Sequence, residues 1–108
     1  MRKYIYTLVL LFCLPILTLA QTTPVPNANF EQALINLGYD TILDGEVTTA
    51  NIDTVTSLDV SYYYSDITDL TGIEAFDSLK ILNCRYTYID TLDLSQNTVI
   101  ESVDAYRS

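Results

Sequence analysis

The stretch DSLKILNC, residues 77–84, contains the spacing that decides the expected fold. Its apolar residues Leu79, Leu82 and Cys84 stand at positions i, i+3 and i+5. The same triplet occurs 24 residues earlier and 21 residues later, as Val55, Leu58 and Val60 and as Ile100, Val103 and Ala105. A near-constant period kept three times in a short chain predicts a repeated structural unit.

The triplet has the form L-x-x-L-x-L at a period of 20–29 residues, which signals a leucine-rich repeat. We therefore predict an α/β solenoid in which each repeat contributes one short parallel β-strand to a concave face. An N-terminal helix would cap the stack. The alternative is an ordinary β-rich domain in which the spacing is a coincidence.

The capping helix is predicted from an apolar stripe within residues 21–54. The members of the stripe are spaced i, i+3, i+4 and i+7: Phe30, Ala33, Leu34 and Leu37. Asn29 with Gln32 resembles a capping box, and Gly38 is suited to end the helix. A terminal repeat has one neighbour, so its outer side needs a cover. A free amphipathic helix that binds a partner or a membrane is the alternative.

Three segments carry a resemblance to a known family: VTSLDVS, DLTGIEAFDSLKILNC and TLDLSQNTVIESVDA. They resemble the leucine-rich repeat proteins exported by Bacteroidota, and the 24-residue unit also resembles internalin-type repeats. The block VPNANFEQALINLGYDTILDGEVTTANIDT is similar to the N-terminal cap of that family. The resemblance covers nearly all of residues 24–108. It implies the architecture strongly and an activity weakly.

Residues 1–20 have the features of a secretory signal peptide. Arg2 and Lys3 precede an apolar run, and Ala20 provides a small residue at the expected cleavage site. The alternative to a signal peptide is a membrane span, but the run is interrupted by Pro15 and is short for one. The predicted organisation is a signal peptide (1–20), an N-terminal cap (21–54) and two to three leucine-rich repeats (55–108). The predicted location is secreted or at the outer cell surface.

The chain is acidic, with 14 Asp and Glu against 5 Lys and Arg and a net charge of −9. Cleavage after residue 20 would remove two of the five cations. Such a surface repels nucleic acid and anionic membrane, and it favours cations or basic partners. We expect no nucleic acid, no membrane insertion after cleavage and no cofactor.

The predicted strands present outward side chains in three rows, because side chains alternate along a strand. The binding candidates on this face are Ser57, Asp59 and Ser61, then Ile81, Asn83 and Arg85, then Ser102, Asp104 and Tyr106. Stacking the rows gives three columns, of which the middle one is Asp59, Asn83 and Asp104. Repeat proteins use this face to bind ligands. The alternative is that these polar residues are merely solvated.

Tyrosines stand where the resembled family has polar turn residues. The candidates for an aromatic patch are Tyr62, Tyr63, Tyr64, Tyr86 and Tyr88, with Tyr106 nearby. Tyrosine is favoured at interfaces because it has an apolar ring and a polar tip. The alternative is that the rings pack over neighbouring coils. The family's turn asparagine is replaced by Tyr63 and Thr87, which makes the turn geometry uncertain.

Cys84 would be the only cysteine of the processed chain. It occupies the third apolar slot of its repeat, so we expect a small buried side chain in the core. A reactive or metal-binding thiol is the alternative, but the chain has no histidine to share a metal. No metal site is predicted.

The motif DTILDGE, residues 40–46, resembles the start of an EF-hand loop, with Asp at positions one and five and Gly at six. Positions three and twelve are Ile42 and Asn51, so a carboxylate ligand is missing at both. We therefore favour an Asp-Gly turn over a calcium site.

The sequence offers no catalytic constellation, and we expect no enzyme activity. The leading hypothesis is a secreted or surface-displayed recognition module that binds protein or glycan through the concave face. The alternatives are the N-terminal, non-catalytic part of a longer exported enzyme, and a structural adhesion or surface protein. No C-terminal cap follows residue 104, so we expect the chain to be part of a longer protein.

Overall fold

The computed structural model describes residues 20–61 and 66–106. Those residues form one α-helix, five three-residue strands and two 3-10 turns. In chain order the elements are β1 (Thr22–Pro24), α2 (Ala28–Asn36), β2 (Glu46–Thr48), η2 (Thr49–Asn51), β3 (Ser57–Asp59), η3 (Ile73–Ala75), β4 (Ile81–Asn83) and β5 (Ser102–Asp104). The predicted signal peptide lies outside the described residues apart from Ala20.

Both ends of α2 are set by local side chains and turn chemistry. The Asn27 side chain accepts a hydrogen bond from the backbone N–H of Phe30 at 2.9 Å, which caps the first turn. At the other end Gly38 has a φ of +90°, and its N–H and that of Tyr39 bond back to Ile35 and Leu34. The predicted capping box is wrong, because Asn27 rather than Asn29 is the cap.

The helix lies against a two-stranded antiparallel sheet formed by β1 and β2. Phe30, Ala33 and Leu34 of the predicted stripe are buried, together with Val25 and Val47. Leu37, the fourth member, is exposed, because it is the C-cap residue at which the helix ends. The apolar stripe therefore ends one turn earlier than its spacing suggests.

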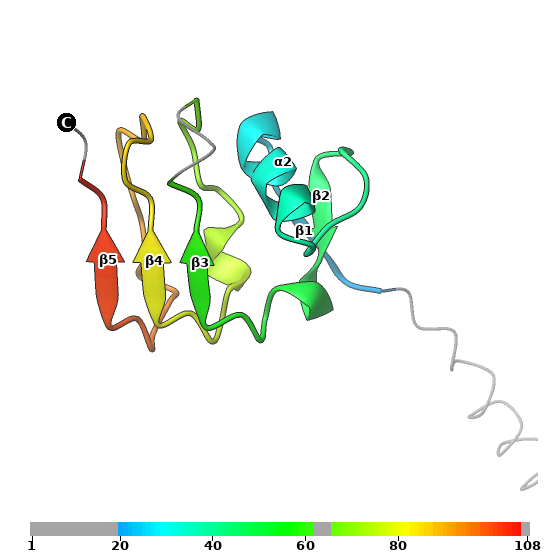
Figure 1. Ribbon diagram of the computed structural model, residues 1–108. Coiled ribbons are helices and arrows are strands. Elements are labelled where there is room, and N and C mark those ends of the chain that lie inside the picture. The colour runs from blue at the N-terminus through cyan, green and yellow to red at the C-terminus, as the bar shows by residue number, and fades with distance from the viewer. Residues whose placement is uncertain (1–19, 62–65, 107–108) are drawn as a thin grey trace, which may run out of the picture.

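The second sheet is parallel and has the order β3-β4-β5 (Figure 1). Its register pairs Leu58 with Leu82 and Leu82 with Val103. Backbone bonds continue past the strands, since Val60 N donates to Asn83 O and Cys84 N donates to Asp104 O. This register confirms the pairing that the triplet spacing predicts.

One apolar core runs through both sheets, from Val25 to Cys84. Phe30 of α2 and Phe76, just after η3, are its largest fully buried side chains. The two parts of the core meet at Gly72, where a Cβ would lie 3.0 Å from the backbone oxygen of Pro24 and 3.0 Å from Val25 Cγ2.

The predicted solenoid is wrong: the described residues form a small globule with one helix and two small sheets. A solenoid is a row of equivalent units that contact only their neighbours. Here the non-repeating β1–α2–β2 part shares one core with the parallel sheet. The helix is therefore an integral part of that core, and a sheet of three short strands forms no concave wall.

The third apolar triplet is not buried as its spacing predicts. Val103 is 42% exposed, Ala105 is exposed, and Ile100 is partly buried. Within the part of the chain that the structure describes, β5 has a partner strand on one side only. An apolar side chain needs neighbours on both sides to leave water, and Val103 has them on one side.

Candidate functional site

The outward side chains of the parallel sheet form the surface that we call the β3–β5 face. It consists of Ser57, Asp59, Ile81, Asn83, Arg85, Ser102, Asp104 and Tyr106. The register places Ser57 beside Ile81 and Ser102, and Asp59 beside Asn83 and Asp104. The structure therefore brings together two of the three columns that the sequence predicts from separate segments.

The side chains of the middle column form hydrogen bonds to the protein's own backbone. The side-chain oxygen of Asp59 accepts a bond from Ser61 N at 2.9 Å, that of Asn83 from Arg85 N at 3.2 Å, and that of Asp104 from Tyr106 N. Each contact closes a turn directly after a strand. One oxygen of each side chain is thus occupied. The second polar atom is left for a ligand in Asp59 and Asn83, whereas Asp104 Oδ2 lies 3.6 Å from Arg85 Nε.

Ser61 does not belong to this face, although the sequence predicts it there. It is buried, and its hydroxyl donates to Asp59 Oδ1 at 2.5 Å. The turn after β3 carries Ser61 inward, so strand alternation no longer applies to it.

Arg85 organises an aromatic cluster beyond the ends of β4 and β5. Its guanidinium carbon lies 5.1 Å from the centre of the Tyr86 ring and 5.4 Å from that of Tyr106. The two rings meet edge to face at 6.2 Å, and Arg85 Nη2 donates to the Tyr86 hydroxyl at 3.1 Å. Arg85 Nε also lies 3.6 Å from Asp104 Oδ2. These contacts hold a cationic and aromatic surface in place before any ligand arrives.

Tyr86 has an unusual backbone conformation, with a φ of +63°. A residue with a side chain costs roughly 1–2 kcal/mol in this left-handed region. Its N–H donates to Tyr106 O at 2.8 Å, so the conformation aligns the two tyrosines. Such strain often occurs where a side chain is positioned for a purpose.

The aromatic patch is present only in part among the described residues. Tyr86, Tyr88 and Tyr106 are each about half exposed. Tyr62, Tyr63 and Tyr64 lie outside the residues that the structure describes. The packing of Tyr86 on Tyr106 also fits the expectation that the rings cover neighbouring chain segments, and both remain accessible to a partner.

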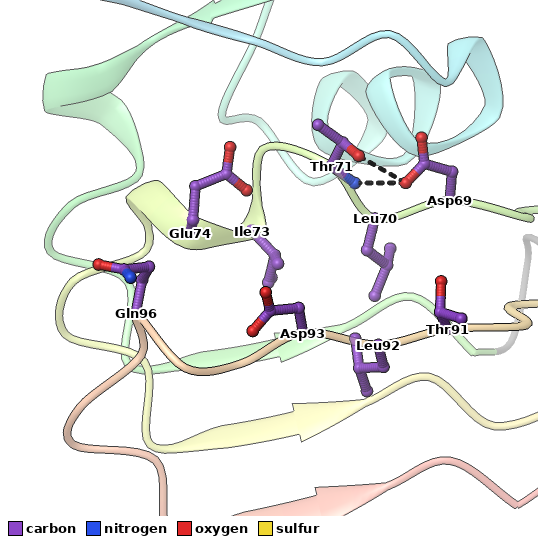
Figure 2. A pocket seen from close by; sticks show the side chains of 9 residues that line it. All are labelled: Asp69, Leu70, Thr71, Ile73, Glu74, Thr91, Leu92, Asp93 and Gln96. Carbon is purple, nitrogen blue, oxygen red and sulfur yellow. Dashed lines mark hydrogen bonds between the residues drawn. The ribbon is translucent and has the colours of Figure 1, made fainter.

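A pocket of about 320 Å³ lies away from the strands, between two segments of the chain (Figure 2). Its apolar part comes from Leu70, Ile73 and Leu92, and its acidic residues are Asp69, Glu74 and Asp93. Asp69 accepts bonds from the backbone and hydroxyl of Thr71, as Figure 2 shows. Glu74 accepts a bond from Gly72 N, and Asp93 accepts one from Ser95 N. Acidic groups over an apolar floor are complementary to a lysine or arginine side chain.

Asn97 is a structural residue that the sequence analysis missed. It is buried, and its Nδ2 donates to Ile73 O at 2.9 Å and to Phe76 O at 3.2 Å. It thereby fastens the turn at η3 to the next segment. The asparagine of the motif LDLSQN was the available signal. Thr87, at the position where the family's asparagine was expected, instead donates to Cys84 O and closes its own turn.

Cys84 is buried, as predicted, and pairs with no other cysteine in the described residues. Burial raises the pKa of its thiol, and the negative charge of Asp104 raises it further. A thiol in this state is a weak nucleophile.

Comparison with curated proteins supports a relationship of this chain to leucine-rich repeat proteins. The relative is Internalin J from Listeria monocytogenes serotype 4b (strain F2365), which is 38% identical over 73 residues. The match covers 68% of this chain and 8% of Internalin J. No family model matches the chain. The match does not support the Bacteroidota type that the motifs suggested.

Across the described residues, no helix is both long enough and apolar enough to cross a membrane.

Proposed function

We propose that this chain is a non-enzymatic recognition module, secreted or displayed at the cell surface, that binds a protein through the β3–β5 face. The similarity to Internalin J supports a protein-binding surface module more than any other single observation. The signal-like residues 1–20 favour export. The enzyme hypothesis has no comparable support, because the chain has no histidine and no catalytic constellation.

The charge of the molecule favours a basic partner. Asp59 and Asp104 flank the face, and Lys80 and Arg85 are the only cations among residues 20–61 and 66–106. Arg85 is already engaged by Asp104 and two tyrosines. Arg85 thus offsets the charge of Asp104, but the 14 acidic residues of the chain far outnumber its five cations. A basic surface would meet net negative charge on approach, and the contact should weaken as salt screens it.

The side chains best suited to carry the contact are Ile81 and Tyr106. Both are exposed, and the side chain of neither closes a turn. An aliphatic and an aromatic group on a rigid sheet provide the apolar centre that protein interfaces need. Tyr106 and Tyr86 would equally suit a sugar ring, so a glycan is the finer alternative.

The first prediction tests this face. The double variant I81A/Y106A should weaken binding to basic proteins at least tenfold, because it removes the apolar contact and leaves the turns intact. Binding of the purified chain is measured on a panel of immobilised proteins of known isoelectric point and on a glycan array, at low and high salt.

Val99→Ala is the matched control, because Val99 is 43% exposed and Ile81 is 48% exposed, yet Val99 lies off the strands. It should leave binding unchanged. Binding to glycans alone, or equal binding by the double variant, would show that the proposal is wrong.

A further inference from the structure

Gln21 directly follows the predicted cleavage site after Ala20. Both residues are exposed, and strand β1 begins one residue later, at Thr22. Removal of residues 1–20 would therefore make Gln21 the first residue of the chain, directly before the first strand. Strand β1 lies at the end of the molecule opposite β5, so a change at Gln21 would not touch the β3–β5 face (Figure 1).

The fold holds the carbonyl group of Gln21 and leaves its two nitrogens free. The carbonyl oxygen accepts a hydrogen bond from Thr49 N at 2.9 Å, and the next residue, Thr22, pairs with Thr48 of β2. Within residues 20–61 and 66–106, neither the backbone nitrogen nor the side-chain amide of Gln21 makes a hydrogen bond. Both groups are therefore available for chemistry that leaves the β1–β2 sheet unchanged.

A glutamine at the first position of a chain can cyclise on itself. The neutral α-amine attacks Cδ of its own side-chain amide, a new N–Cδ bond forms, and the Cδ–Nε2 bond breaks. The proton of the amine passes to the departing nitrogen, which leaves as ammonia, and a five-membered lactam remains. An α-amino group titrates near neutral pH, so a useful fraction is unprotonated. Because both reacting groups belong to one residue, the reaction needs no second reactant.

We propose that Gln21 is a modification site and becomes pyroglutamate once residues 1–20 have been removed. This inference rests on the export that the proposed function includes. The lactam joins the two groups that the fold does not use, and it keeps the carbonyl oxygen that accepts the bond from Thr49 N.

The lactam would protect the first strand from trimming. Aminopeptidases remove residues one at a time from a free α-amine, and the cyclised chain has none. Loss of Gln21 and Thr22 would remove the bond to Thr49 N and the first of the three residue pairs between β1 and β2. A sheet of two short strands is only marginally stable without its neighbours, so each pair contributes to holding it together.

The second prediction concerns the mass of the exported protein. The full chain is expressed in a bacterial host, and the protein recovered outside the cytoplasm is examined by intact mass spectrometry. Its mass should be that of residues 21–108 less one ammonia. The cyclised chain should also resist digestion by an aminopeptidase.

Gln21→Asn is the matched control, because asparagine carries the same amide on a side chain one methylene shorter. Its cyclisation would require a strained four-membered ring. Q21N should be cleaved at the same place, should keep its ammonia, and should be trimmed by the aminopeptidase at least tenfold faster than the parent chain. An exported parent chain that begins at Gln21 and keeps its ammonia would overturn the proposal.

A second preparation separates the failure of export from the failure of cyclisation. A fusion protein cleaved directly before Gln21 produces the same first residue without any export. If the exported chain keeps residues 1–20, the export proposal is wrong, but the chain released from the fusion should still lose one ammonia during incubation at neutral pH. Retention of the ammonia by that chain, at the level seen in Q21N, would then refute the assignment of Gln21.

Discussion

At the scale of single residues, short acidic and amide side chains determine how the chain turns after each strand. Asp59, Asn83 and Asp104 each accept a bond from the backbone N–H two residues further on. Asp69 and Asp93 do the same in the segments between strands. Asparagine and aspartate favour this contact because the side chain mimics a backbone turn. Many acidic side chains of this protein therefore accept hydrogen bonds from the backbone.

The third prediction concerns the pKa of Asp93. The side chain and backbone N–H of Ser95 donate hydrogen bonds to this carboxylate and lower its pKa. Because the folded pKa lies below the unfolded one, the stabilisation is present above the unfolded pKa and is lost as pH falls through the folded pKa. Ser95→Ala should raise the pKa of Asp93, as measured by NMR titration of side-chain carboxyl carbons. The matched control Thr98→Ala should not, and an unshifted pKa in S95A would contradict the assignment.

At the scale of elements, three-residue strands and single turns are too short to hold their own shape. Contacts from a later segment stabilise them, as when Asn97 bonds to the carbonyls of Ile73, the first residue of η3, and Phe76, which follows it. Ser78 likewise donates to Asp53 O at 2.7 Å. Hydrogen bonds between distant segments therefore help to hold these short elements in place.

The fourth prediction tests this stabilisation at Asn97. Asn97→Ala should lower the free energy of unfolding by about 1–3 kcal/mol, because it removes two buried hydrogen bonds and leaves a small gap. Chemical denaturation followed by circular dichroism gives the value. Asn29→Ala is the control, since the amide of Asn29 makes one exposed bond to Asp66 O and its loss should cost about 0.5 kcal/mol or less. Equal effects of the two variants would show that Asn97 is not a special contact.

At the scale of the whole molecule, the stability of both sheets depends on one shared core. The approach of Gly72 to Pro24 and Val25 is where the segment after β3 meets the strand that begins the globule. Gly72 also has a φ of +111°, which only glycine adopts freely. Helix α2 and the parallel sheet therefore stand in a fixed relation. The β1–α2–β2 part and the β3–β5 face are therefore joined through one apolar core.

The fifth prediction separates backbone strain from close contact. Gly72→Ala should destabilise the protein by about 1–3 kcal/mol through its backbone conformation. It should cost more because the new Cβ would lie 3.0 Å from Pro24 O, which must shift to make room. Gly38→Ala pays the conformational cost alone, because no atom lies within 4 Å of its Cβ position. The unfolding temperature of G72A should therefore be lower than that of G38A. Equal losses of stability in the two variants would show that the close approach of Gly72 to Pro24 adds no steric cost.

The sequence by itself determined what depends on local pattern. The triplets predicted the pairing of Leu58 with Leu82 and of Leu82 with Val103. The i, i+3, i+4 stripe predicted most of α2, and the apolar slot of Cys84 predicted its burial. These features follow from strand alternation and helical periodicity, which act over a few residues.

Tertiary structure alone decided whatever requires distant segments to meet. It placed Glu31 near Asp40 and Asp44, and it let the Asn97 side chain bond to a distant turn. It also left Val103 exposed. It also replaced the expected solenoid with a small globule. The physical reason is that burial and electrostatics depend on which surfaces lie together in space, and a period read along the chain contains no such distances.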